Sequence, residues 1–147
     1  MSLFRVIAHI DASPARVWDV LRDWEGSAEW MVDATTVEVI GEQREGAGTR
    51  VRAVTKIAGM PLTDEMVVTD WVPERLLQVR HEKFPIIGPA WFALAPAGRG
   101  TRFEWGEDLR PPLGKLGELG GAILRTPIER VLAESLHKLK RVCESGG

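Results

Sequence analysis

The chain has 147 residues, of which 44% are hydrophobic and 27% charged, and this composition is typical of one globular domain spanning residues 1–147. The 19 basic side chains nearly balance the 21 acidic ones, which gives a formal net charge of -2 and argues against a nucleic-acid partner. No stretch is apolar enough to cross a bilayer and the first residues lack a secretion signal, so we expect a cytoplasmic protein without integral membrane association.

The N-terminal segments predict a strand followed by two short helices. In Phe4–Ile10 every second side chain is apolar, which is typical of a strand with one buried face. Ser13 is a helix cap and Pro14 suits the first helical position, so a helix is expected from there until Gly26. Residues Ser27–Met31 have room only for a short second turn. The apolar residues that recur at helical spacing in the first helix are Val17, Trp18, Leu21 and Trp24.

From Thr36 onward the apolar residues recur with a period of two, which predicts strands. Glycine and proline divide this region into short segments joined mostly by tight turns, such as Gly98–Gly100. Strands joined by short turns pair in the antiparallel sense, so with the first strand we expect a seven-stranded antiparallel meander. The segments expected after the first of these strands are Arg50–Ile57, Leu62–Trp71, Leu76–Glu82, Ala90–Ala95 and Thr101–Leu109.

A long amphipathic helix is predicted at the C-terminus. Pro127 lies inside the helical pattern, so we expect either a kink there or a helix that begins at Thr126. The preceding residues 113–121 contain glycines at 114, 117, 120 and 121 and are expected to form a loop or a weak first helical turn, suited to gating a cavity. One face of the helix is apolar except for Ser135, and its residues are Leu124, Ile128, Val131, Leu132, Leu136, Leu139 and Val142.

Four segments together resemble the START-like, Bet v 1-like superfamily, whose bacterial members include polyketide cyclase/dehydrase and lipid-transport proteins. They read SPARVWDVLRDWEGSAEW, VVTDWVPERLL, GTRFEWGEDL and ESLHKLKRVCE, and the resemblance covers nearly the whole chain. It implies the α+β helix-grip fold, in which a curved seven-stranded antiparallel sheet wraps around the long C-terminal helix and two short helices follow the first strand. It also implies that a ligand is bound in a cavity between the sheet and the helices.

Polar side chains on faces that are otherwise apolar are the candidates for site chemistry. His81, Glu107 and Thr55 share strand faces with apolar neighbours, and Ser135 interrupts the apolar face of the last helix. His81 and Glu107 are weak candidates for a catalytic proton-transfer pair, because burial raises the pKa of a carboxyl and lowers that of an imidazole. The alternatives for these two residues are a hydrogen bond that orients a ligand, or a solvated place at a strand end. For Ser135 the alternative is a small residue that lets the helix approach the sheet.

The aromatic content is unusual, with six Trp and no Tyr. Trp provides a large apolar surface with one donor, which suits either a core or the wall of a pocket. We predict Trp91 and Trp105 as cavity walls on adjacent strands and Trp30 at the entrance, with a place in the core as the alternative for each. The predicted ligand-binding residues are Trp30, Thr55, Val68, Val79, His81, Trp91, Phe103, Trp105, Glu107, Leu124, Ile128 and Ser135.

The remaining reactive side chains do not predict a cofactor site. Cys143 is the only cysteine, so no intrachain disulfide is possible and an inert thiol is expected near the end of the last helix. His9 and His137 fall on outward faces, and no His/Cys cluster has metal-ligand spacing. The glycines of LGKLGELGG match neither a dinucleotide fingerprint nor a P-loop. We therefore expect no metal and no cofactor.

The function predicted from these observations is the sequestration or transport of a small hydrophobic molecule, such as a lipid, an isoprenoid or a polyketide-like compound. The protein is expected to be a monomer or a weak dimer. Two alternatives remain open. One is a polyketide cyclase/dehydrase-type enzyme, with an aromatase/cyclase or dehydratase reaction in the same cavity and His81 or Glu107 moving a proton. The other is a chaperone-activator-like interaction module, which predicts an exposed apolar patch in place of a deep cavity.

Overall fold

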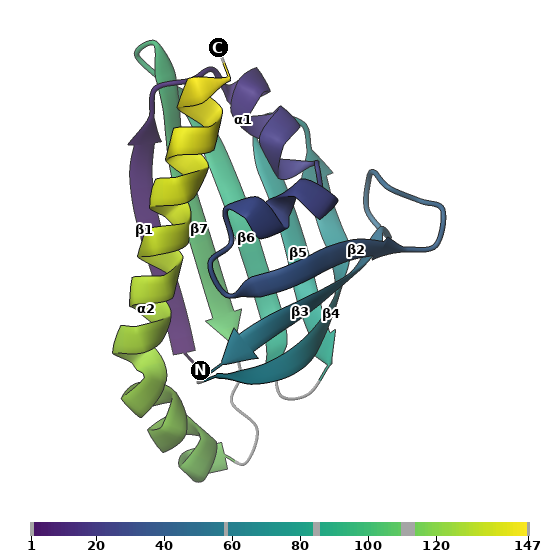
Figure 1. Cartoon of the computed structure of the whole chain (residues 1–147), viewed down its shortest axis with the longest axis vertical. Coiled ribbons are helices and arrows are strands. Elements are labelled where there is room, and N and C mark those ends of the chain that lie inside the picture. The colour runs from purple at the N-terminus through teal and green to yellow at the C-terminus, as the bar shows by residue number, and fades with distance from the viewer. Residues whose placement is uncertain (1, 58, 84–85, 110–113, 147) are drawn as a thin grey trace.

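The protein folds into a strongly curved sheet with a long helix along one side of it (Figure 1). This computed structural model describes residues 2–57, 59–83, 86–109 and 114–146, with residues 2, 57, 114–125 and 127 described by their backbone alone. The elements in chain order are β1 (Ser2–Ile10), α1 (Pro14–Leu21), the 3-10 helix η1 (Glu25–Glu29), β2 (Ala34–Ile40), β3 (Arg50–Ile57), β4 (Met60–Val72), β5 (Leu76–Lys83), β6 (Ile86–Ala97), β7 (Gly100–Leu109) and α2 (Gly114–Ser145).

The seven strands form one antiparallel sheet in the order β1-β7-β6-β5-β4-β3-β2. Apart from the β1–β7 pair, each strand pairs with its neighbour in the chain, and all these connections except the longer one between β2 and β3 are short. The first strand returns to pair with the last, from Ser2 opposite Leu109 to Ile10 opposite Thr101. The predicted α+β helix-grip fold with a seven-stranded antiparallel sheet is thus confirmed.

The first helical region is divided earlier than the sequence predicts. The side chain of Ser13 caps α1 by accepting a hydrogen bond from the N–H of Arg16 at 3.2 Å, as expected. The helix ends at Leu21, and Gly26, predicted as its end, lies inside η1. The cause is local, since Asp23 Oδ1 accepts a hydrogen bond from the N–H of Gly26 at 3.2 Å and so competes with continuation of the α-helix.

Two strands, β4 and β6, are longer than predicted. Each continues through a proline at which the sequence predicts a break. Pro61 lies in β4 opposite Lys56, and Pro89 lies in β6 opposite Arg80. At Pro61, β4 pairs with β3 alone and its pairing with β5 begins only at Met66. On one side of β4 no strand is paired at Pro61, so no backbone N–H has to donate a hydrogen bond there. A sheet tolerates proline at such an edge position.

The C-terminal helix α2 begins before the position that its apolar pattern indicates. It is helical from Gly114 and continues through Pro127, so the alternatives of a loop at the glycines and of a start at Thr126 are wrong. A kink at Pro127 stays a prediction. The gate expected at residues 113–121 also stays one, because residue 113 and the side chains that follow it lie outside the described part of the chain.

The C-terminal end of α2 is tied to the start of the chain. Arg16 donates hydrogen bonds to the carbonyl oxygens of Cys143 at 3.3 Å and of Val142 at 3.2 Å. The N–H of Asp11 donates to Glu144 Oε2 at 2.8 Å. The two bonds from Arg16 satisfy carbonyl groups that a helix end leaves without partners. All three bonds hold α2 beside β1 and α1 (Figure 1).

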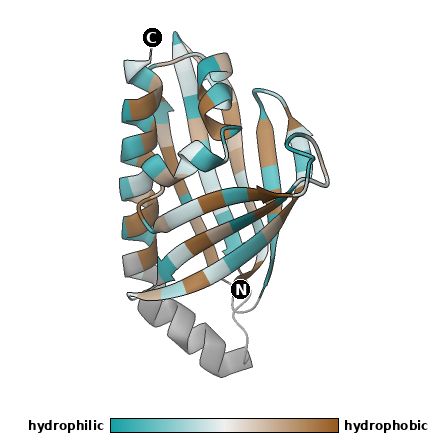
Figure 2. Cartoon of the chain, turned by 45° about the vertical axis from the view of Figure 1, so that its right-hand side comes forward, coloured by the Kyte–Doolittle hydropathy of each residue, from teal (hydrophilic) through white to brown (hydrophobic). Residues whose placement is uncertain are grey.

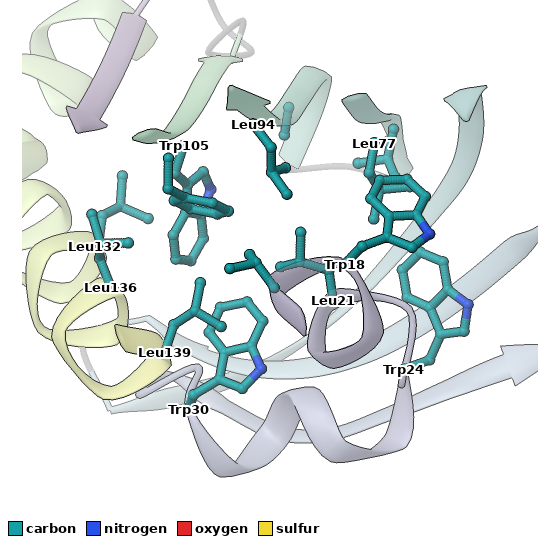
Figure 3. Close-up of a cluster of buried hydrophobic side chains, with 14 of the residues drawn as sticks. Trp18, Leu21, Trp24, Trp30, Leu77, Leu94, Trp105, Leu132, Leu136 and Leu139 are labelled. Atoms are coloured by element: carbon teal, nitrogen blue, oxygen red, sulfur yellow. The ribbon is translucent and has the colours of Figure 1, made fainter. Parts of the chain in front are cut away.

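The core contains two groups of aromatic rings, which Figure 3 shows on either side of Leu21. In one, Trp18 meets Trp71 edge-on with ring centroids 5.1 Å apart. In the other, Trp30 packs against both Phe92 and Trp105, each at 5.9 Å, close to three leucines of α2. The leucines Leu132, Leu136 and Leu139 are buried, as the amphipathic pattern predicts.

The outer face of the sheet is mostly polar, and hydrophobic and hydrophilic residues alternate along its strands (Figure 2). Trp91 is an exception. Its Nε1 donates a hydrogen bond to Glu104 Oε2 at 2.8 Å, while Arg5 holds Glu104 Oε1 through Nε at 3.1 Å and Nη2 at 2.9 Å. The indole lies over Gly106, where a Cβ would collide with its ring.

Leu139→Ala tests whether the packing of α2 on the sheet stabilises the fold. Leu139 has no exposed surface, so we expect the free energy of unfolding to fall by about 2–5 kcal/mol in a urea titration. Lys138→Ala, at the exposed neighbouring position, should change it by less than about 0.5 kcal/mol. Equal losses in the two variants would contradict this assignment of the core.

Candidate functional site

A cavity of about 350 Å³ lies between the inner face of the sheet and α2. Most of its wall is apolar and comes from β3 to β7 and the described part of α2. It is the hollow that the sequence predicts. The lining residues are Trp24, Met31, Asp33, Ala34, Ala53, Thr55, Lys56, Asp64, Met66, Leu77, Val79, His81, Ile86, Ala90, Trp91, Phe92, Trp105, Glu107, Leu109, Ile128, Val131 and Leu132.

The polar groups of the cavity gather around His81 on β5. The Nδ1–H of His81 donates a hydrogen bond to Asp64 Oδ1 on β4 at 2.8 Å. Its Nε2 lies 3.9 Å from Glu107 Oε2 on β7, which is too far for a hydrogen bond. Nε2 is buried and has no hydrogen-bond partner among the described residues. The imidazole therefore has one nitrogen held by the protein and one buried nitrogen without a partner among the described residues.

Strand register explains why these three side chains meet. Met66 pairs with His81, so Asp64, two residues earlier, is the diagonal neighbour of His81 on the same face. His81 and Glu107 are separated by β6, whose facing residues are Gly88 and Ala90. These two residues are too small to block the gap between the strands on either side. At Gly88 any Cβ would collide with the carbonyl oxygen of Asp108, so β7 itself requires a glycine there.

The pKa of His81 is raised above its ordinary value by its neighbours. Burial works in the opposite direction, because it favours the neutral ring, and the side chain is only 8% exposed. The hydrogen bond to Asp64 and the negative charges of Asp64 and Glu107 outweigh that effect. The ring is therefore protonated at a higher pH than an isolated histidine.

The carboxyl of Glu107 is shifted in the direction of its neutral form. Burial raises the pKa of Glu107 to about 7, although the charge of His81 and a hydrogen bond from Trp105 lower it, and Asp33 and Asp64 raise it further. Burial also raises the pKa of Asp33, helped by the charge of Asp64 and opposed by the Asp33 backbone N–H. Glu107 titrates near neutral pH beside an imidazole whose pKa is raised, so this end of the cavity can exchange a proton with a bound molecule.

The sequence-predicted ligand-binding residues divide into two groups in the structure. Thr55, Val79, His81, Trp91, Trp105, Glu107 and Ile128 border the cavity. Trp30, Val68, Phe103 and Ser135 are buried in the core instead. The side chain of Leu124 lies outside the described part of the chain. Trp30, expected at the entrance, is 1% exposed, because its ring is enclosed by Phe92, Trp105 and α2.

Trp91 differs most from its predicted role as a wall. Gly106, and not Trp105, is its cross-strand partner, and its Nε1 bonds to Glu104 on the outer face. Because successive side chains of a strand point to opposite faces, its indole cannot share a face with Trp105. Trp91 is among the residues that border the cavity, but its indole lies on the outer face, and Phe92 is the residue whose ring meets Trp105, at a centroid distance of 5.2 Å.

Ser135 and Cys143 of α2 are both buried. The Oγ of Ser135 accepts a hydrogen bond from the N–H of Val32 at 2.9 Å, which links α2 to the segment before β2. Burial raises the pKa of the Cys143 thiol to about 11, which is consistent with the expected inert thiol. His9 and His137 are exposed, as predicted.

Sequence reasoning missed Asp64 and Asp33. Asp64, Met66 and Val68 alternate in phase, so they share one face of the strand. Because Val68 is predicted to face inward, the same pattern predicts that Asp64 faces inward too. Asp33 lies in the segment before β2, where no periodicity indicates the direction of a side chain.

A second, more open hollow of about 680 Å³ lies on the surface. Its charged walls largely bind one another, since Arg22 pairs with Asp19 and Glu45, and Arg44 pairs with Glu25 beside it. The hollow has no apolar interior comparable with the buried cavity, so the buried cavity is the better candidate for a ligand site.

The fold and the cavity define a hydrophobic ligand-binding domain. Residues 1–144 match the family described as Polyketide cyclase / dehydrase and lipid transport. The chain belongs to this family, as the sequence resemblance indicates. No curated protein matches the sequence. Among the described residues, no helix is both long and apolar enough to span a bilayer.

Solved structures confirm the fold at low sequence identity. TTHA0849 from Thermus thermophilus is 20% identical, with a TM-score of 0.85 over 99% of both chains. The Zhui aromatase/cyclase from a Streptomyces species is 18% identical, with a TM-score of 0.82 over 97% of this chain and 93% of its own. A START superfamily protein from Mycobacterium smegmatis is 14% identical, with a TM-score of 0.72 over 97% and 94%.

Glu107→Gln should remove a pH dependence of stability. In the unfolded chain Glu107 ionises near 4.5, whereas its pKa in the folded protein is about 7. Between these pH values the unfolded state binds fewer protons, so the free energy of unfolding of the wild type falls as the pH rises and is constant above about 7. Relative to Glu107→Gln, the wild type should lose on the order of 3 kcal/mol over this range in urea titrations.

The matched control for this experiment is Glu82→Gln, which removes a carboxylate from the outer part of β5. Its stability should follow that of the wild type across the same pH range. A Glu107→Gln curve parallel to that of the wild type would contradict the burial of an ionisable group at this position.

Proposed function

We propose that the protein binds one small, predominantly apolar molecule in the buried cavity and orients it by a hydrogen bond at His81. The observation that carries this proposal is the unpartnered Nε2 of His81, which is buried in a cavity whose walls are otherwise mainly apolar. A buried polar group without a partner costs about 1–3 kcal/mol, which a ligand oxygen or nitrogen would recover. Membership of the family, whose description includes lipid transport, supports the same proposal.

The size of the cavity limits the ligand. Its volume of about 350 Å³ is at the lower end of the roughly 300–1,000 Å³ range of ligand pockets. A single ring with a short chain fits such a space better than a lipid with two acyl chains. The apolar walls favour binding by excluding water from the ligand, at about 25 cal/mol for each Å² of apolar surface buried. The mechanism is sequestration, and it needs no cofactor.

The exposed apolar side chains do not favour the interaction-module alternative. Among the described residues, Leu3 and Ile7 share one face of β1, Met60 and Val72 lie at the two ends of β4, and Val32 and Ile87 lie on other segments. Scattered residues of this kind are ordinary on a protein surface. The cytoplasmic location and the monomeric or weakly dimeric state stay predictions from the sequence.

Ala90→Leu tests binding in the cavity. Ala90 is 6% exposed and lines the cavity between Val79 and Glu107, so a larger side chain fills the space that a ligand needs. We expect the affinity for para-propyltoluene to fall at least about tenfold, since the probe and the new side chain compete for one volume. Binding is measured by the methyl NMR signals of Met31 and Met66, which line the cavity, with exposed Met60 as the internal reference.

Ala95→Leu, at an exposed position of the same strand, is the matched control and should leave the affinity within about twofold. Ala53→Leu fills the cavity from β3 and serves if Ala90→Leu unfolds. Probe binding that shifts Met60 alone, or that survives both filling variants, would contradict binding in the cavity. Native mass spectrometry of the protein purified from its own host would identify any molecule retained in the cavity.

The titrating groups in the cavity favour an enzymatic second candidate, a cyclase/dehydrase-type reaction. In the dehydration of a β-hydroxyketone, a base removes the proton next to the carbonyl, the new C=C bond forms, and the C–O bond breaks as the hydroxyl leaves with an acid proton. Glu107 and His81 are close enough to serve as base and acid, and Asp64 holds the imidazole in place. The similarity to a solved aromatase/cyclase is at the level of the fold.

The enzymatic candidate is tested with the aldol adduct of acetone and benzaldehyde, a β-hydroxyketone with one ring. If the candidate is correct, the protein accelerates its loss of water, followed by the absorbance of the conjugated product. Glu107→Gln should then lower the rate by about 10²–10⁴-fold, whereas Glu82→Gln should not change it. If the wild type gives the same dehydration rate as buffer alone, the enzymatic candidate is wrong and only binding remains.

A further inference from the structure

His81 and Glu107 are close enough for one oxygen atom to hydrogen-bond to both. His81 Nε2 and Glu107 Oε2 are 3.9 Å apart and both residues line the cavity. An oxygen to one side of the line that joins these two atoms could lie about 2.8 Å from each, which is the ordinary length of a hydrogen bond. His81 Nδ1 is not available for this purpose, because it is bonded to Asp64 at 2.8 Å.

The two groups together offer one donor and one acceptor when they share one proton. With the proton on the imidazole, Nε2–H donates and the Glu107 carboxylate accepts. With the proton on Glu107, the carboxyl donates and Nε2 accepts. A hydroxyl group both donates and accepts, so it can complete both hydrogen bonds in either case. An ether or a carboxylate only accepts, and can complete one of them.

The charges that face the site are mostly negative. Asp33 before β2, Asp64 on β4 and Glu107 on β7 are acidic, and His81 on β5 lies between the last two. The other cation of the lining is Lys56 on β3, which is exposed. The lining residues of β6 and the described part of α2 carry no charge. Where these carboxyl groups are ionised, they would repel an anionic head group at His81.

We propose that the ligand is an uncharged hydrophobic alcohol or phenol whose hydroxyl bridges His81 Nε2 and Glu107 Oε2, and that the cavity discriminates against molecules with a carboxylate head. The inference rests on the proposed function, since it specifies the chemical class of the molecule bound in the same cavity. It goes beyond that function by assigning a role to Glu107 and by excluding fatty-acid-like ligands that the apolar walls alone would accept.

The test compares four probes that share a para-propylphenyl body. They are para-propylphenol, para-propyltoluene, para-propylanisole and para-propylbenzoate, and their dissociation constants are measured at neutral pH from the Met31 and Met66 methyl signals. The phenol should bind at least about tenfold more tightly than the toluene and the anisole, because it completes two hydrogen bonds. The benzoate should bind at least about tenfold more weakly than the phenol.

Glu107→Leu should reduce the advantage of the phenol over the toluene to less than about threefold, since one of the two partners is lost. Glu82→Leu removes a carboxylate from an exposed position beside His81 in sequence and should retain the full advantage. The wild-type probe series is decisive by itself if Glu107→Leu does not fold.

Each other outcome overturns the inference in a distinguishable way. If the phenol and the toluene bind equally and both shift Met31 and Met66, the cavity binds apolar molecules but the hydroxyl assignment is wrong. If the benzoate binds most tightly and loses affinity in Lys56→Gln, the polar anchor is Lys56 at an anionic site. If none of the probes shifts these signals, the proposed function fails together with the inference.

Discussion

The small side chains on the inner face of β6 are the constraint on which the site depends. Gly88 and Ala90 lie between His81 on β5 and Glu107 on β7, so the two polar side chains approach to 3.9 Å across an intervening strand. Gly88 cannot carry a side chain, because the carbonyl oxygen of Asp108 occupies the place of its Cβ. The close packing of β6 on β7 thus creates the space in which two titratable groups meet.

The site is polar where a core would ordinarily be apolar, and this has an energetic cost. Asp64 and His81 are almost fully buried, and their hydrogen bond offsets part of the cost of taking two polar groups out of water. The hydrogen bond from Trp105 and the charge of His81 do not offset the burial of Glu107, so its pKa is raised. The aromatic cluster of Trp30, Phe92 and Trp105 and the leucines of α2 supply apolar burial beside it. A destabilised polar site within a well-packed shell is typical of a functional position.

The phase of each strand limited how well the site could be predicted. For β5 and β7 the alternation favours the inner face for His81 and Glu107, with a solvated strand end as the alternative, and both residues line the cavity. For β6 the sequence AWFALA has apolar residues at every position, so its two faces look alike, and the prediction that Trp91 shares a face with Trp105 is wrong because Phe92 is opposite Trp105. A shift of one residue reverses the face of every side chain in a strand. Trp30 shows a different limit, because a helical turn gives no signal of whether its ring faces a cavity or a core.

The sequence by itself determined the element types, the antiparallel meander, the amphipathic closing helix and the family, because these depend on local periodicity and on turn and cap residues. It did not determine where α2 begins, since helical backbone formed across residues whose composition favours a loop. Tertiary structure alone brought Asp64, His81 and Glu107 together and enclosed the apolar space beside them. The physical reason is that these contacts join three strands, and their distances depend on register, sheet curvature and the side-chain volumes of the strand between, none of which is a local property of the chain.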